Sequence, residues 1–309
     1  AIGVPVSVAL EDAGKWVKGK ATAKGLAVIS GEPSTYKGWD SYKLQLGVAA
    51  KAGGSSKKFV VDTLYFFYNT NLGEKGKEVI SPPASGPQYT GKLAIIVDDC
   101  GYDIKSVRRL PDVGLPFSYA ILPYKDFSNY ALEVIKNTGN VPMLHLPMEP
   151  SNRSAMSEGK STICTDMKEK EIRALTRKAI DSLPGIVGAN NHQGSKATTD
   201  KRVMETVLRE MKKSDLFFVD SKTIGTSIAR DMAREMDVKT ARNDVFLDNS
   251  KDIEEIRAQV YKAIKLAEEN GSAIAICHAR PATVAMWEKY ADEFRKSCFK
   301  FVHVTEVLY

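Results

Sequence analysis

The sequence predicts an α/β protein in which a small α+β region precedes a larger region built around a parallel sheet. After residue 92, short apolar segments alternate with segments whose apolar residues recur at helical spacing. This alternation is typical of a parallel sheet covered by helices, as an open doubly wound sheet or an incomplete barrel. A segment rich in proline and glycine separates the two regions. We therefore expect an accessory domain at 1–78, a linker at 79–92 and the larger domain at 93–309.

The first region is predicted to contain a helix within residues 7–25 and two strands at 41–50 and 58–70. The glycine-bearing segment 51–56 is the expected turn between these strands. The region contains no histidine and no cluster of residue types that commonly act in catalysis. Any enzymatic chemistry is therefore expected in the larger domain.

The larger region is predicted to contain about seven strand–helix repeats. The expected strands are 93–97, 117–121, 141–145, 186–190, 216–219, 273–277 and 300–304, with a short one at 245–247. Helices are expected within 165–185, 200–214, 224–237 and 250–271, and Asp166 with Glu169 is the predicted N-terminal cap of the first. Neither G-x-G-x-x-G nor G-x-x-x-x-G-K-[ST] follows a strand, which argues against dinucleotide and P-loop sites.

Composition and charge exclude several classes of protein. The 44 basic and 38 acidic residues give a net charge of +6 without a dense basic stripe, so no nucleic acid is expected as a partner. No apolar run approaches the ~20 residues of a transmembrane helix. No secretory leader is recognisable after Ala1, which leaves room for one that has been removed. The four cysteines form no C-x-x-C pair, which argues against a structural zinc knuckle.

Polar side chains follow several of the predicted strands, at the edge where parallel α/β folds gather their chemistry. They are Asp98 and Asp99, His145 and Glu149, Asn190, Asn191, His192 and Ser195, Asp220 to Thr223, and His278 and Arg280. Three of the four histidines thus fall on one rim, together with a pair of adjacent carboxylates. Imidazole nitrogens and one carboxylate are the ligand set of a catalytic zinc or a similar divalent metal. The pattern therefore predicts a metal site.

The motifs "VDDCGY", "LHLPMEP", "NNHQGS", "FFVDS", "DVFLDN" and "CHARP" occur in this order. Together they resemble the divergent polysaccharide deacetylase family, a branch of the NodB-like carbohydrate esterases. The resemblance covers residues 91–309 and not residues 1–90. It implies a distorted (β/α) barrel of the NodB-like type and a metal-dependent hydrolase that removes N-acetyl groups from a polysaccharide. It also implies a periplasmic or secreted protein.

The resemblance assigns roles to four residues. It implies that Asp98 is the catalytic base, Asp99 and His145 are metal ligands and His278 is the catalytic acid. Glu149 stands where the family has the second histidine of an H-x-x-x-H element. We expect His192 to supply the missing imidazole and zinc to be the metal. The alternative is that Glu149 binds the metal or orients a ligand.

Other residues are expected to have supporting roles. Asn191, Ser195 and Asp220 are expected to shape the pocket or to orient ligands. Asp248 and Arg280 fit structural hydrogen bonding better than chemistry. The expected partner is a polysaccharide with N-acetylated sugars, and residues 1–90 could bind glycan, mediate oligomerisation or contact an envelope protein.

Two other functions remain open from the sequence. One is a non-catalytic envelope module on the same fold, which binds glycan or regulates a peptidoglycan hydrolase; the altered H-x-x-x-H element favours it. The other is a glycosidase with paired carboxylates. Asp98 and Asp99 suit a glycosidase poorly, because its two acids must face each other across a sugar.

Overall fold

The computed structural model describes residues 2–4, 10–23, 27–36, 39–52, 55–68, 91–296 and 299–309. Its internal contacts divide the chain into two units, Ala1–Gly86 and Pro87–Tyr309. Most of the expected linker lies outside the described residues, so its boundaries stay a prediction. Among the described helices, none is both long and apolar enough to cross a membrane.

The first unit packs one helix against a four-stranded sheet. Its elements are β1 (Ile2–Val4), α1 (Leu10–Ala23), β2 (Ala27–Tyr36), β3 (Trp39–Ala52) and β4 (Ser55–Tyr68). The sheet order is β1-β4-β3-β2, with β1 parallel to β4 and the other neighbours antiparallel. The core includes Leu44 and Phe66. The predicted helix and both predicted strands are present, but β1 and β2 were missed. Strand β2 contains Gly31 and Pro33, which an edge strand tolerates because its outer side needs no ladder hydrogen bonds.

The second unit alternates strands and helices along the described residues from 91 onward. Its strands are β5 (Lys92–Cys100), β6 (Phe117–Ile121), β7 (Val141–Met148), β8 (Gly188–Gln193), β9 (Phe217–Asp220), β10 (Thr240–Arg242), β11 (Val245–Phe246), β12 (Ser272–His278) and β13 (Lys300–Val302). Its α-helices are α2 (Ile104–Arg109), α3 (Ser128–Asn137), α4 (Glu169–Asp181), α5 (Lys201–Lys213), α6 (Ala229–Glu235), α7 (Ile253–Asn270) and α8 (Pro281–Lys296). Short 3₁₀ helices lie at Leu110–Val113, Arg153–Ala155, Gly159–Ser161, Ala197–Thr199 and Val304–Glu306. Every predicted strand of this region overlaps an observed one.

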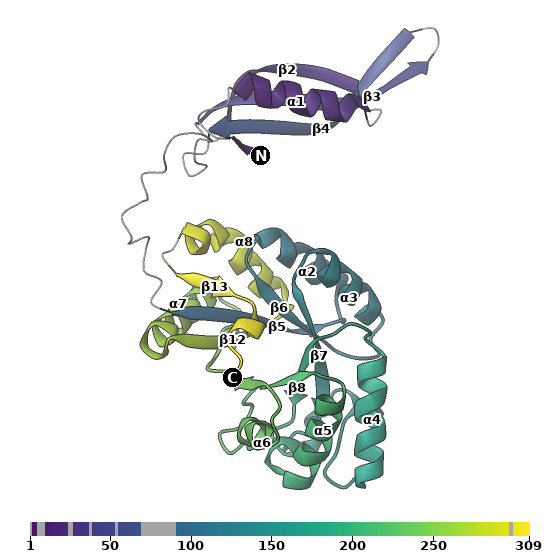
Figure 1. Ribbon diagram of the computed structural model, residues 1–309, viewed down its shortest axis with the longest axis vertical. Coiled ribbons are helices and arrows are strands. Elements are labelled where there is room, and N and C mark those ends of the chain that lie inside the picture. Colours follow the sequence, from purple (N-terminus) through teal and green to yellow (C-terminus); the bar gives the residue numbers. More distant parts are fainter. Residues whose placement is uncertain are drawn as a thin grey trace. The chain divides into compact units, whose positions relative to one another are not determined.

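The nine strands form one parallel sheet that curls into a partial barrel, with helices around its outside (Figure 1). The strand order is β10-β9-β8-β7-β6-β5-β12-β11, and β13 pairs with the first residues of β5. The sequence-based expectation of a distorted (β/α) barrel is confirmed. Because all strands are parallel, their carboxyl ends share one edge of the sheet.

The two faces of the curled sheet have different surroundings. Along β5, Leu93, Ile95 and Val97 pack with residues of the helices, whereas Ala94 and Ile96 belong to a smaller cluster inside the curl. This division follows from the alternation of side chains along a strand. The same alternation decides which polar residues at the carboxyl edge point to the inside.

One predicted detail is wrong. Helix α4 begins at Glu169, and the carboxylate of Glu171 accepts a hydrogen bond from the backbone nitrogen of Lys168 at 2.7 Å. Asp166 instead forms an ion pair with Arg153 at 2.8 Å. The cap therefore forms two residues later than the predicted pair of Asp166 and Glu169, because the chain up to Met167 belongs to the preceding loop.

Candidate metal centre and catalytic site

Strand alternation brings four polar side chains to the inner face of the curl. Asp98 follows Ala94 and Ile96 in the inner row of β5, and His278 follows Ile274 and Ile276 in β12. In β7 and β8, the outward residues Leu144 and Ala189 belong to the cluster that packs with the helices. Their neighbours His145 and Asn190, which are register partners, therefore point inward.

Asp99 joins this group because the backbone leaves regular strand geometry. A regular strand would direct Asp99 to the side opposite Asp98. Its φ is instead +62°, in the left-handed region, and the pairing of β5 with β6 shifts register between Val97 and Cys100. Aspartate adopts this conformation more readily than most residues do. The change in backbone direction at Asp99 allows the carboxylates of Asp98 and Asp99 to face the same site.

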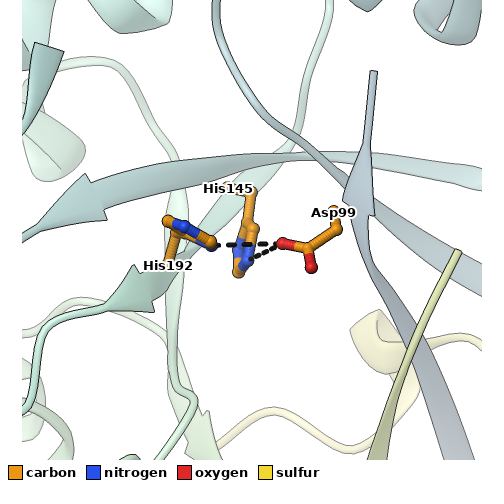
Figure 2. A group of neighbouring side chains, drawn as sticks. All are labelled: Asp99, His145 and His192. Atoms are coloured by element: carbon orange, nitrogen blue, oxygen red, sulfur yellow. Dashed lines mark ion pairs between the residues drawn. The ribbon is translucent and has the colours of Figure 1, made fainter. Parts of the chain in front are cut away.

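Asp99, His145 and His192 form a compact cluster of possible metal ligands, and Figure 2 shows the three side chains converging. Their ligand atoms all lie within 4.8 Å of one another. Asp99 Oδ1 is 3.1 Å from His192 Nδ1 and 3.5 Å from His145 Nε2. Asp99 Oδ1 is buried, yet within the described part of the chain no donor meets it in hydrogen-bond geometry. A buried carboxylate oxygen that receives no hydrogen bond is well suited to bind a cation.

The partners of His145 fix which of its nitrogens faces the cluster. Asn190 Nδ2 donates to Asp98 Oδ1 at 2.8 Å, because a carboxylate can only accept. The amide oxygen of Asn190 must then accept from His145 Nδ1, at 2.6 Å. His145 therefore carries its proton on Nδ1 and presents the lone pair of Nε2, the form that binds metal.

His192 is oriented in a similar way by Ser157. The hydroxyl of Ser157 lies 2.9 Å from His192 Nε2 and can accept its proton, which leaves Nδ1 free to face Asp99. Burial alone would raise the pKa of Asp99, but without a metal the rings of His145 and His192, protonated on the nitrogens that face it, hold that pKa well below its ordinary value. The carboxylate is therefore ionised, as a metal ligand must be.

Asp98 and His278 lie side by side, as register partners on β5 and β12. Burial raises the pKa of Asp98 above its ordinary value, against the opposing effect of His145 and His278. A bound cation would lower the pKa of Asp98 again. The two residues thus place a carboxylate and an imidazole next to the cluster, on the same inner face.

His278 is held by Asp248, from the segment between β11 and α7. Asp248 Oδ1 accepts from His278 Nδ1 at 2.8 Å, while Oδ2 accepts from the His278 backbone nitrogen at 2.8 Å and from Thr283 Oγ1 at 2.7 Å. Burial alone would lower the pKa of His278, but Asp248 and the nearby Asp98 and Asp99 raise it above its ordinary value. His278 therefore favours its protonated form and keeps Nε2 available.

Glu149 takes no part in the cluster. Its buried carboxylate accepts from the backbone nitrogen and the hydroxyl of Thr165, each at 2.7 Å, and from Lys196 Nζ at 3.0 Å. Burial alone would raise the pKa of Glu149, but these donors lower it. Of the two candidates for the third ligand, the structure groups His192 with Asp99 and His145.

The other expected site residues support loops around the cluster. Asn191 Oδ1 accepts from the Ser221 backbone nitrogen at 2.9 Å, Ser195 Oγ accepts from the Ser151 backbone nitrogen at 2.9 Å, and Asp220 Oδ1 accepts from the Lys222 backbone nitrogen at 2.8 Å. Asn191 and Asp220 point outward by strand alternation. Arg280 lies at the rim, with Nη2 3.8 Å from Asp99 Oδ2 and its side chain half exposed.

Sequence reasoning missed the roles of Asn190, Asp248 and Ser157. Asn190 stood among the rim residues without a role, and alternation could have supplied one, because it lies two residues before His192 and thus shares its face. Asp248 was judged structural, and its contact with His278 depends on the pairing of β11 with β12. The sequence carries no signal for Ser157, which lies in the long segment between β7 and α4.

Comparisons with known proteins agree with this architecture. A 205-residue stretch is 37% identical to the uncharacterized protein YibQ of Escherichia coli (strain K12), covering 66% of this chain and 64% of that protein. The chain is also 34% identical over 195 residues to an uncharacterized protein of Haemophilus influenzae, covering 63% of this chain and 69% of the relative. The chain thus spans less than two thirds of the length of the E. coli relative.

Two solved structures share the fold of the second unit. An uncharacterized protein from Agrobacterium tumefaciens matches with a TM-score of 0.67 at 19% identity, covering 72% of this chain and 91% of that chain. A putative cellobiose-phosphate cleavage protein from Enterococcus faecalis matches with a TM-score of 0.53 at 16% identity, covering 71% and 99%.

A family model supplies the classification. The model described as "Divergent polysaccharide deacetylase" matches residues 95–308, which include every residue of the cluster and its neighbours Asp98 and His278. The resemblance noted in the sequence motifs is thereby confirmed. The chain belongs to the divergent polysaccharide deacetylase family.

Proposed function

We propose that the second unit is a metal-dependent hydrolase that removes N-acetyl groups from the sugars of a polysaccharide. The observation that carries the proposal is the placement of Asp98 and His278 beside the Asp99, His145 and His192 cluster. A buried carboxylate and an oriented imidazole on the same face as three metal ligands are the groups that amide hydrolysis requires. The membership of the chain in a polysaccharide deacetylase family supports this substrate class.

The three ligand side chains suit zinc, because two imidazole nitrogens and one carboxylate oxygen are ligands of catalytic zinc sites that keep a position open. When bound, such an ion would polarise the acetyl carbonyl and lower the pKa of water in the site. Asp99, His145 and His192 would hold it. Asn190 and Ser157 would keep both imidazoles turned toward it.

Asp98 is positioned to act as the base. Asn190 holds Oδ1 of Asp98 at 2.8 Å, which leaves Oδ2 to take the proton from the water that attacks the carbonyl carbon. His278 is positioned to act as the acid, because Asp248 holds its Nδ1 proton and Nε2 can donate to the departing sugar nitrogen. The carbon–nitrogen bond then breaks, and acetate and a free amine are released.

We also propose a periplasmic or secreted setting, in which the substrate is a cell-envelope or other polysaccharide. In this proposal the first unit serves as an accessory domain that contacts glycan or another envelope protein. None of the cluster residues comes from the described part of that unit.

Metal content tests the first step of the proposal. Elemental analysis of the full chain is expected to find about one divalent metal per molecule, lost in Asp99→Ala and in His192→Ala. His303→Ala is the matched control. Of the four histidines in the sequence, His303 is the one that belongs neither to the cluster nor to the proposed acid position at His278. A wild type that takes up no metal, even from a zinc solution, would overturn the mechanism.

Acetate release tests the second step. The metal-loaded wild type is expected to release acetate from N-acetylated oligosaccharides, whereas His278→Ala binds the same sugars and releases none. Glycan binding by the wild type without acetate release from any tested sugar would favour the non-catalytic envelope module instead.

A further inference from the structure

Three sulfur atoms lie close together in the segment between β7 and α4, apart from the proposed metal cluster. Cys164 and Met167 form a C-x-x-M sequence in which the Met167 backbone nitrogen donates to the Cys164 carbonyl oxygen at 3.2 Å. This turn brings the thioether sulfur of Met167, Sδ, to 3.5 Å from the Cys164 backbone nitrogen. Met156 comes from an earlier part of the segment and places its Sδ 3.9 Å from Cys164 Sγ. We call Met156, Cys164 and Met167 the sulfur group.

The sulfur group lies close to the surface, although its thiol is covered. Cys164 is 3% exposed, whereas Met156 and Met167 are partly exposed. The backbone before the thiol is fixed, because Ile163 bridges to Met148 at the end of β7. Methionine side chains have three rotatable bonds and adapt to what they contact. A small ion can therefore reach the thiol by moving two thioether side chains, without disturbing the core.

The thiol of Cys164 faces two acceptors but has one proton to donate. Its Sγ lies 3.5 Å from the carbonyl oxygen of Thr162 and 3.9 Å from Met156 Sδ. When the carbonyl oxygen accepts the proton, lone pairs of the two sulfur atoms face each other. Thiolate and thioether sulfurs are soft ligands, which favour Cu(I). Two sulfur atoms at this separation can both lie about 2.3 Å from one ion, the usual length of a metal–thiolate bond.

The charged groups around the thiol cancel in pairs. Glu149 pairs with Lys196 at 3.0 Å and Asp166 with Arg153 at 2.8 Å, and these four groups act on the titration of Cys164. Burial, followed by Glu149, raises the pKa of Cys164, so the free thiol keeps its proton at neutral pH. Loss of this proton leaves one negative charge, which a monovalent ion neutralises. A divalent ion would leave an uncompensated positive charge in a covered site.

We propose that the sulfur group binds one Cu(I) ion. Cys164 Sγ releases its proton to solvent and bonds to the ion as a thiolate, while the Sδ atoms of Met156 and Met167 bond to it as neutral ligands. The metal arrives as Cu(I), so the step needs no oxidant or reductant. The inference goes beyond the proposed function, because it concerns a second metal with different ligand chemistry. Its test does not depend on acetate release.

A competition titration against the Cu(I) chelator bathocuproine disulfonate, without oxygen, measures the affinity of the full chain for Cu(I). The wild type and Asp99→Ala are expected to bind about one ion equally tightly. Met156→Leu should bind at least about tenfold more weakly, since residues that only support a metal ligand already contribute about 10–100-fold. Cys164→Ser should bind more weakly still. The matched control is Met236→Leu, which replaces a partly buried methionine outside the sulfur group and should bind like the wild type.

X-ray absorption at the copper edge identifies the ligands. The expected spectrum has sulfur neighbours at about 2.3 Å from the copper and no nitrogen neighbours. Met156→Leu conserves volume and apolar character, so this variant is expected to fold even where Cys164→Ser does not. Urea denaturation without copper checks that its stability matches that of Met236→Leu.

Three results would overturn the inference. The first is a wild type that takes no Cu(I) from the chelator. The second is equal affinity for Cu(I) in Met156→Leu and Met236→Leu, which would reduce the site to a single thiol. The third is a spectrum with nitrogen neighbours, together with binding that is lost in Asp99→Ala and kept in Cys164→Ser, which would assign the copper to the cluster of the proposed function.

Discussion

Replacing Glu149 with alanine is expected to destabilise the fold without removing the metal. The carboxylate of Glu149 is buried and accepts two hydrogen bonds of 2.7 Å from Thr165, while its ion pair with Lys196 involves a side chain that is 47% exposed. Hydrogen bonds to a charged group contribute ~1.5–3 kcal/mol each, and an exposed ion pair contributes at most about 1 kcal/mol. The two hydrogen bonds and the ion pair together give an expected loss of about 3–7 kcal/mol in the free energy of unfolding, because the Thr165 backbone N–H also loses its partner.

Urea denaturation of the full chain measures this loss, and elemental analysis measures the metal. Glu268→Ala is the matched control, because it truncates an exposed glutamate of α7 and is expected to change stability by less than about 0.5 kcal/mol. Glu149→His, which recreates the H-x-x-x-H spacing, should not raise the metal content. Loss of metal from folded Glu149→Ala, with stability unchanged, would refute the assignment of Glu149 to the loop and of His192 to the metal.

Three further outcomes are expected. Asp98→Asn should keep its metal and lower kcat by about 10²–10⁴-fold, the usual contribution of a general base; a rate near that of the wild type would remove Asp98 from this role. The rate of the wild type should fall as pH rises through the pKa of His278, because the acid must be protonated. Asp248→Asn removes the carboxylate that raises this pKa, so this alkaline limb of the pH–rate profile should move to lower pH, and an unmoved limb would contradict the pairing. Removing the metal with a chelator should lower the thermal midpoint of the wild type but not that of Asp99→Ala, since an ion bound only by the folded state stabilises it; equal shifts in both proteins would argue against the cluster as the binding site.

The sequence predicted the architecture of the second unit because its apolar residues repeat with the periods of strands and helices. The segment 93–97, for example, is apolar on both faces, as a strand between helices and an inner core must be. The edge strand β2 escaped prediction because tertiary pairing with β3 outweighs its glycine and proline. The order of the strands around the barrel is likewise a property of long-range pairing.

The residues at the carboxyl edge were also visible in the sequence, since parallel strands bring their ends together. Asp98, His145, His192 and His278 all stand on the inner face that alternation assigns to them. Alternation alone would have preferred Asn190 to Asn191 as a neighbour of the cluster. The sequence by itself therefore determined the fold class, the family and the chemical character of the rim.

Only the tertiary structure decided how these groups combine. Asp99 reaches the cluster through a positive φ and a register shift, and neither follows from local propensity. His192 rather than Glu149 faces Asp99, because the chain after β7 turns Glu149 toward Thr165. The physical reason is that periodicity assigns a side chain to a face, whereas its partners depend on where separate strands and loops meet in space.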